Sequence, residues 1–162
     1  KALWQTICRL MQHRAYVGYT LVTSFAFMAL FGYISASPFV FQNVLGLSST
    51  GYSIAFGANA LGIILFGAVS ARMVSYIEPR RLIRVSLAIL LVSSIAVLVF
   101  VGVGAGSIFM IPAIFLAVAS VGPILGNASA LAIRQVPESA GTGSAGLAAV
   151  ACFSFLTQEK RI

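Results

Sequence analysis

The groups that could do chemistry inside the long apolar stretches of this chain are neutral. Between Ala15 and Ala71 there is no aspartate, glutamate, lysine or arginine, and the interiors of the later apolar stretches lack them as well. Ionisable side chains at mid-membrane depth mark ion and proton pathways. Without them, the chain offers no proton relay, catalytic carboxylate pair or metal cage of its own. We therefore expect neither an enzyme nor a cofactor or metal site.

Amides and hydroxyls remain as candidates for binding. Asn59 and Asn127 each lie within an apolar stretch, and Ser35 and Ser37 lie just before Pro38. Each amide can simply hydrogen-bond to a neighbouring helix, a contact worth about 0.6 kcal/mol on average in membranes. It can equally line a water-filled cavity and touch a substrate, and we take Ser35, Ser37, Asn59 and Asn127 as candidate cavity residues. Because proline lacks a helix donor, a kink is expected near Ser35–Pro38.

Membrane-spanning helices must position these residues. The chain has 162 residues, of which 60% are hydrophobic and 8% are charged, whereas ordinary globular domains carry about 25% charged residues. A helix needs about 20 apolar residues to cross a hydrocarbon core about 30 Å thick. The sequence therefore predicts an all-α, polytopic transmembrane bundle, with residues 1–162 as a single membrane domain. The expected spans are about 16–42, 50–71, 82–103, 107–132 and 140–157.

Basic residues mark one face of the expected bundle. The net charge is +7, and every lysine and arginine except Lys160 and Arg161 falls at or beside alternate loops, starting with the N-terminal segment. The densest group is the basic loop region that contains Arg72, Arg80, Arg81 and Arg84. Cytoplasmic loops carry an excess of lysine and arginine, so the N-terminal end and this loop are expected to be cytoplasmic. The same rule accounts for the positive charge, and nucleic acid is not expected as a partner.

Small residues indicate where the helices approach one another. Lipid does not push apolar helices together, so close packing at small residues does much of that work. Gly62 in the second span, and Gly122 and Gly126 in the fourth, are expected to make tight helix–helix contacts. The alternative is that these glycines form a hinge that lets the helices rock.

Several motifs, taken in order, resemble one transporter family. They are Tyr33-Ile-Ser-Ala-Ser-Pro-Phe-Val-Phe-Gln42, Gly46-Leu-Ser48, Phe56-Gly-Ala-Asn-Ala-Leu-Gly62, Ala71-Arg72, Gly126-Asn-Ala-Ser-Ala-Leu-Ala132 and Ala140-Gly-Thr-Gly-Ser-Ala145. They are similar to helices seven, eight, ten and eleven of the Bcr/CflA drug-resistance transporters of the major facilitator superfamily, over about residues 10–150. The chain departs from that family at Gly126, where a proline is usual, and at Gly143, where an alanine is usual.

The resemblance implies twelve helices in two halves around a central cavity, with drug export driven by proton entry through alternating access. On this basis the chain is a partial half, helices seven to eleven, of a bacterial cytoplasmic membrane protein. The implied partners are the lipid bilayer, a missing N-terminal half that carries the proton-coupling acids, a small amphipathic drug-like substrate, and protons. Two alternatives stay open: a truncated, non-transporting membrane subunit, and a transporter of another small solute.

Overall fold

The structure, a computed structural model, describes residues 14–104 and 107–134. Its elements are helix α2 (Arg14–Phe39), the π-helix η1 (Val40–Val44), and helices α3 (Ser49–Met73), α4 (Pro79–Val103) and α5 (Ser107–Arg134). Four stretches in this part are long and apolar enough to cross a membrane: Arg14–Val44, Ser49–Met73, Pro79–Val103 and Phe109–Arg134. The expected all-α transmembrane bundle is confirmed for these residues. The expected fifth span, 140–157, lies outside them.

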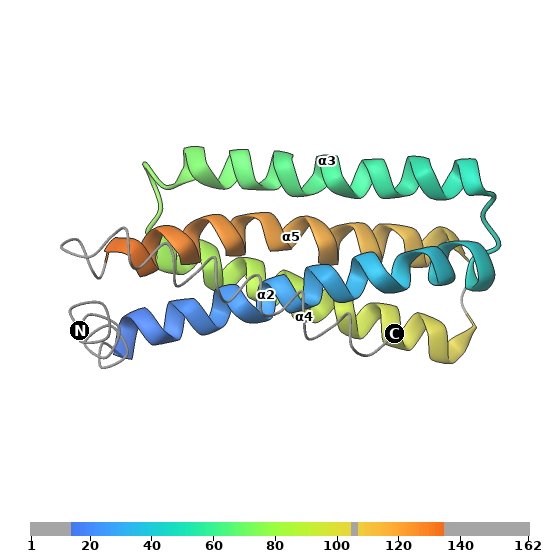
Figure 1. The fold of residues 1–162 in the computed structure, drawn as a ribbon, viewed down its shortest axis with the longest axis horizontal. Coiled ribbons are helices and arrows are strands. Elements are labelled where there is room, and N and C mark those ends of the chain that lie inside the picture. The colour runs from blue at the N-terminus through green and yellow to red at the C-terminus, as the bar shows by residue number, and fades with distance from the viewer. Residues whose placement is uncertain (1–13, 105–106, 135–162) are drawn as a thin grey trace, which may run out of the picture.

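Helix α5 is the centre of the bundle. Figure 1 shows α3 along one side of α5, with α2 and α4 along the other, and all three pack against α5. Successive helices run in opposite directions (Figure 1), so α2 and α4 begin at the end of the bundle where α3 and α5 finish. The side chains that are fully buried lie mostly on α5, where Ala119, Ile124, Ala128 and Ala132 are 0% exposed.

Local sequence chemistry sets the ends of the helices. The hydroxyl of Ser48 accepts a hydrogen bond from the Gly51 amide at 3.2 Å and so caps the start of α3. Pro79 occupies the first turn of α4, where a missing N–H costs nothing. Gly104 ends α4 with a φ of 69°, a left-handed conformation that glycine adopts without strain.

The helix that begins at Arg14 changes type after Pro38. It remains α-helical through Phe39 and then widens into η1. The Leu45 amide donates to the Val40 carbonyl at 3.0 Å, and the Leu47 amide donates to the Phe41 carbonyl at 2.9 Å. Residues 35–38 remain α-helical, and the change of helix type comes at Val40–Val44 as a widened turn of the kind that is frequent at functional sites. The kink near Ser35–Pro38 stays a prediction.

Candidate functional site

The first polar cluster joins α2 to α3 in the half of the bundle away from the basic loop. Asn59, which is 3% exposed, donates its side-chain amide to the Tyr33 hydroxyl at 2.7 Å. The Tyr33 ring lies nearly parallel to the Phe56 ring, with an interplanar angle of 8° and centroids 6.1 Å apart. Tyr52 adds a second aromatic contact to Phe56 at 5.8 Å. We call Tyr33, Ser37, Phe41, Tyr52, Phe56 and Asn59 the aromatic cluster.

Ser37 connects this cluster to the proline in α2. Pro38 has no N–H to donate to the Ile34 carbonyl four residues earlier. The Ser37 hydroxyl donates to that same carbonyl at 3.0 Å. Since the hydroxyl has one proton, its 3.2 Å contact with the Tyr52 hydroxyl places Tyr52 as the donor. Tyr52 on α3, Ser37 and the backbone of α2 thus form one hydrogen-bonded chain.

The second polar cluster joins α3 to α5 nearer the basic loop. Asn127 donates its side-chain amide to the Ser70 hydroxyl at 2.7 Å and to the Pro123 carbonyl at 2.8 Å. Asn127 and Ser70 are each 5% exposed. A buried amide without partners would be costly in hydrocarbon, and these bonds satisfy both of the Asn127 side-chain donors.

The four candidate cavity residues do not converge on one site in the described part of the chain. Ser37 and Asn59 belong to the aromatic cluster, whereas Asn127 pairs with Ser70. Ser70 follows Asn59 by three helical turns, which separates the two clusters by about 16 Å along α3. Ser35 is exposed, since residues two apart on a helix point about 200° apart and Ser37 points inward.

Sequence reasoning did not select Tyr33, Tyr52 or Ser70 as site residues. A spacing signal was present on α3, because Tyr52, Asn59 and Ser70 are separated by seven and eleven residues. These spacings correspond to about two and three full turns, so the three side chains share one face. Of the three residues only Asn59 is an amide at mid-membrane depth, so Tyr52 and Ser70 were not predicted. Tyr33 carries no comparable signal, because its role depends on which helix lies opposite.

The three candidate packing glycines behave differently. A Cβ added to Gly122 would lie 2.3 Å from the Ile63 carbonyl oxygen, which makes Gly122 a point of backbone contact between α5 and α3. A Cβ added to Gly62 would lie 2.7 Å from the Phe115 ring. Gly126 is exposed, and no atom of the described residues lies within 4 Å of an added Cβ there. The structure therefore gives Gly126 no tight contact.

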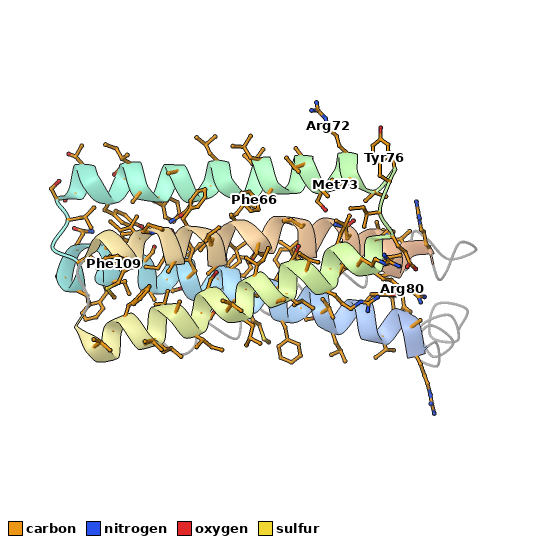
Figure 2. All side chains as sticks on the ribbon, turned by 180° about the vertical axis from the view of Figure 1, so that it is seen from behind. Phe66, Arg72, Met73, Tyr76, Arg80 and Phe109 are labelled. Carbon is orange, nitrogen blue, oxygen red and sulfur yellow. The ribbon has the colours of Figure 1, made fainter. Side chains whose placement is uncertain are left out.

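Arginines gather at one end of the bundle. Arg72, Arg80, Arg81 and Arg84 are all exposed, and Figure 2 shows Arg72 and Arg80 at the end where α3 finishes and α4 starts. Arg14 begins α2 and Arg134 ends α5 at this same end (Figure 1). The described loops at the other end, 45–48 and Gly104, have no charged residue. The structure thus collects the described arginines on one face.

The two clusters consist of neutral polar and aromatic side chains. Within residues 14–104 and 107–134, Glu78 is the only carboxylate, and no group of three metal-ligating side chains comes together. What the clusters present is neutral hydrogen-bonding groups and aromatic faces. Such groups suit recognition of an uncharged or weakly polar ligand.

Comparison with known proteins points to a transporter. No protein-family model and no solved structure matches the chain. The chain is 28% identical over 141 residues to the uncharacterized MFS-type transporter YdgK of Bacillus subtilis (strain 168), an alignment that covers 87% of this chain. This similarity supports membership in the major facilitator superfamily. It does not reach to the Bcr/CflA subtype.

The alignment covers only part of that transporter. The chain spans 35% of the length of the Bacillus relative, and its described part supplies four apolar helices of membrane-spanning length. Together these observations support a multi-pass membrane protein that is similar to an MFS-type transporter.

Proposed function

We propose that the chain forms part of the C-terminal half of a proton-coupled multidrug efflux antiporter that works by alternating access. The similarity to an MFS-type transporter carries the proposal, and the motif resemblance to the Bcr/CflA family supplies the subtype. The N-terminal half would contribute the proton-coupling acids. The absence of carboxylates from the described helices is consistent with that division, since Glu78 lies in a loop.

In this proposal the two polar clusters have different duties. The aromatic cluster places Ser37 and Asn59, which would offer hydrogen bonds to an amphipathic substrate, beside the aromatic surface of Tyr33, Tyr52 and Phe56. Asn127 would bind substrate nearer the arginine-rich end, through its side-chain carbonyl, since both of its N–H groups are used within the bundle. Ser35, which is exposed in this chain, would reach substrate only across the interface with the missing half.

The proposed setting is a bacterial cytoplasmic membrane with the N-terminal end inside. The arginine-rich end of the bundle then faces the cytoplasm, as the distribution of basic residues in short loops favours. The anionic lipids of the inner leaflet would attract the basic residues at these ends of α3 and α4, namely Arg72, Arg80, Arg81 and Arg84.

Replacement of Asn59 by leucine in the full-length protein tests the cavity role. We expect drug efflux per molecule of folded protein to fall about fivefold, the equivalent of one lost hydrogen bond to substrate. Tyr33→Phe is the matched control, because it removes the acceptor of the Asn59 bond but keeps the amide. Efflux is measured with everted vesicles that are energised by a pH gradient.

The comparison of the two variants separates binding from packing. If Asn59 only holds α3 to α2, both variants reduce folded protein alike and leave efflux per molecule unchanged, which would contradict the cavity role. A panel of small metabolites assayed in the same vesicles tests transport of another solute. A chain that serves as a non-transporting subunit would show no gradient-driven flux with any compound.

A further inference from the structure

A crevice lies between α3 and α4 in the half of the bundle nearer the arginines, with α5 behind it. Its volume is about 220 Å³, and we call it the α3–α4 crevice. Its apolar walls include Phe66 and Met73 from α3 and Leu82 and Val85 from α4. Figure 2 shows Met73 on the side of α3 that faces the other helices, whereas Arg72 and Tyr76 point away. No lysine, arginine or carboxylate lines the crevice.

Two serines line the crevice from opposite walls. Ser70 on α3 is 5% exposed and Ser86 on α4 is 7% exposed, so both are more than nine-tenths buried. Several serines elsewhere in the bundle donate to a carbonyl one turn earlier, as Ser24, Ser94 and Ser129 do.

The hydroxyl protons of the two crevice serines have no such acceptor. Ser86 has no hydrogen-bond partner among the described residues, and Ser70 uses its oxygen to accept from Asn127 while its own proton stays unused there. A hydroxyl proton without an acceptor can still form a hydrogen bond with a ligand that brings one. Each hydroxyl is therefore a donor available to a molecule inside the crevice.

We propose that the α3–α4 crevice binds a small, neutral, amphipathic molecule that carries a hydrogen-bond acceptor. The acceptor of the ligand receives hydrogen bonds from the Ser86 and Ser70 hydroxyls. The apolar part of the ligand packs against Phe66, Met73 and Leu82. A charged ligand is excluded because no opposite charge lines the crevice and its desolvation would be uncompensated. The volume is below the roughly 300–1,000 Å³ of sites for drug-sized ligands, so the ligand is the size of a single substituted ring.

The position of the crevice links its occupant to the helix packing. Helices α3 and α4 pack chiefly on α5 rather than on each other. A molecule bound to Ser70 and Ser86 would bridge them directly. Ser70 is also one hydrogen bond from Asn127 on α5, so occupancy would brace all three helices. This site is separate from the aromatic cluster, and the inference does not depend on the proposed drug export.

Photolabelling with two matched probes tests the proposal. The full chain in lipid nanodiscs is illuminated with 4-azidoacetophenone, whose ketone is an acceptor, or with 4-azidotoluene, which lacks one. Mass spectrometry then measures labelling of the crevice peptides 66–73 and 82–86 relative to peptide 99–103 of α4, which is mostly exposed and does not line the crevice. We expect the ketone probe to label the crevice peptides about fivefold more than the control probe, the ratio that one hydrogen bond provides.

Variants of one helix complete the test. Ser86→Ala should abolish the difference between the probes, and Ser86→Thr, which keeps a hydroxyl, should retain it. Ser93→Ala is the matched control, because Ser93 is a buried serine on α4 that does not line the crevice. Equal labelling by the two probes, or a loss of the difference in Ser93→Ala as large as in Ser86→Ala, would overturn the proposal. If Ser86→Ala fails to fold, loss of the difference in Ser86→Thr overturns it instead.

Discussion

Ser37 shows how one hydroxyl lets a proline sit inside a membrane helix. In hydrocarbon no water can satisfy a carbonyl that proline leaves unpaired. Ser37 donates to the Ile34 carbonyl, the group that the amide of residue 38 would otherwise serve, and accepts from Tyr52 on α3. The side chain is 2% exposed, so no solvent competes for these bonds. The role of Ser37 in this chain is therefore explained by the backbone before any ligand is invoked.

A double-mutant cycle between Ser37 and Pro38 measures this compensation. Ser37→Ala alone should destabilise the fold by about 1 kcal/mol, since it leaves the Ile34 carbonyl without a donor. In a Pro38→Ala background the restored amide can donate to that carbonyl. There, the same Ser37 substitution should cost no more than Tyr52→Phe does, because only the cross-helix bond is lost. The free energy of unfolding is measured by titration of detergent-solubilised full chain with sodium dodecyl sulfate.

The control for this cycle is Ser53→Ala. Ser53 is an exposed serine on α3 that donates to the carbonyl of Ser49 at 3.0 Å with no proline involved. It should show no coupling to Pro38→Ala. A coupling near zero between Ser37 and Pro38 would show that the Ile34 carbonyl finds another partner and that the compensation is not made by Ser37.

At the scale of elements, α5 packs closely on α3 because the residues of α5 at this contact, Gly122 and Ala119, are small. Gly122 lets the backbone of α5 meet the Ile63 carbonyl and approach Gly67 of α3. A Cβ added to Gly62 would lie only 3.2 Å from the Ala119 Cβ on α5, so Gly62 also marks a close approach. Close backbone approach maximises dispersion contacts, which carry much of helix association in lipid. The contact between α3 and α5 therefore depends on this short run of small residues.

Gly122→Ala should separate α3 from α5. The added methyl would overlap the backbone oxygen of Ile63, which cannot move without the helix. Overpacking of this kind costs about 1–3 kcal/mol, and we expect the Asn127–Ser70 bond to lengthen with it. Gly126→Ala, one turn away on the same helix, meets no described atom and should not destabilise, since alanine favours a helix over glycine by about 0.5–1 kcal/mol. Unfolding of the two variants side by side checks both values, and equal losses would refute the assignment.

The same two glycines show what could be predicted from the sequence. Apolar stretches place the four helices, and Ser48, Pro79 and Gly104 mark their ends, because these signals are local. The residues against which a helix packs are distant from it in the sequence, so local signals do not identify them. Two helices that cross at an angle meet closely over a short length, so of two glycines one turn apart only Gly122 lies at the contact.

Residue pairing across helices follows the same logic. Asn59 is visible in the sequence as an isolated amide, but its partner Tyr33 is set by the rotation of α2 about its axis. Two chemically similar serines, Ser35 and Ser37, likewise differ in burial because they face opposite sides of α2. The identity of the polar residues could be predicted, whereas their division into two clusters required the three-dimensional arrangement.

At the scale of the whole molecule, successive helices run in opposite directions, so arginines that are scattered along the sequence gather at one end of the bundle. We call this difference in charge between the two ends the polar axis. Each described arginine lies within or next to the loops at one end, and the connections at the other end are uncharged. The cost of moving basic side chains across a bilayer makes such an axis a determinant of insertion. If this axis sets topology, the two ends must be accessible from opposite compartments.

Cysteine accessibility in whole cells tests that orientation. Thr50 lies near the start of α3 and Ser75 lies just after its end, and both residues are exposed. Neither substitution removes one of the arginines. In a background with Cys8 and Cys152 replaced by alanine, a membrane-impermeant maleimide should label the Thr50→Cys variant in intact cells. It should label the Ser75→Cys variant only after the cells are broken.

Replacement of Arg80, Arg81 and Arg84 by glutamine should then raise labelling of the Ser75→Cys variant in intact cells, because the charge bias that retains this loop inside is weakened. Labelling of both original variants from outside would show that the arginine-rich end does not define a single membrane face.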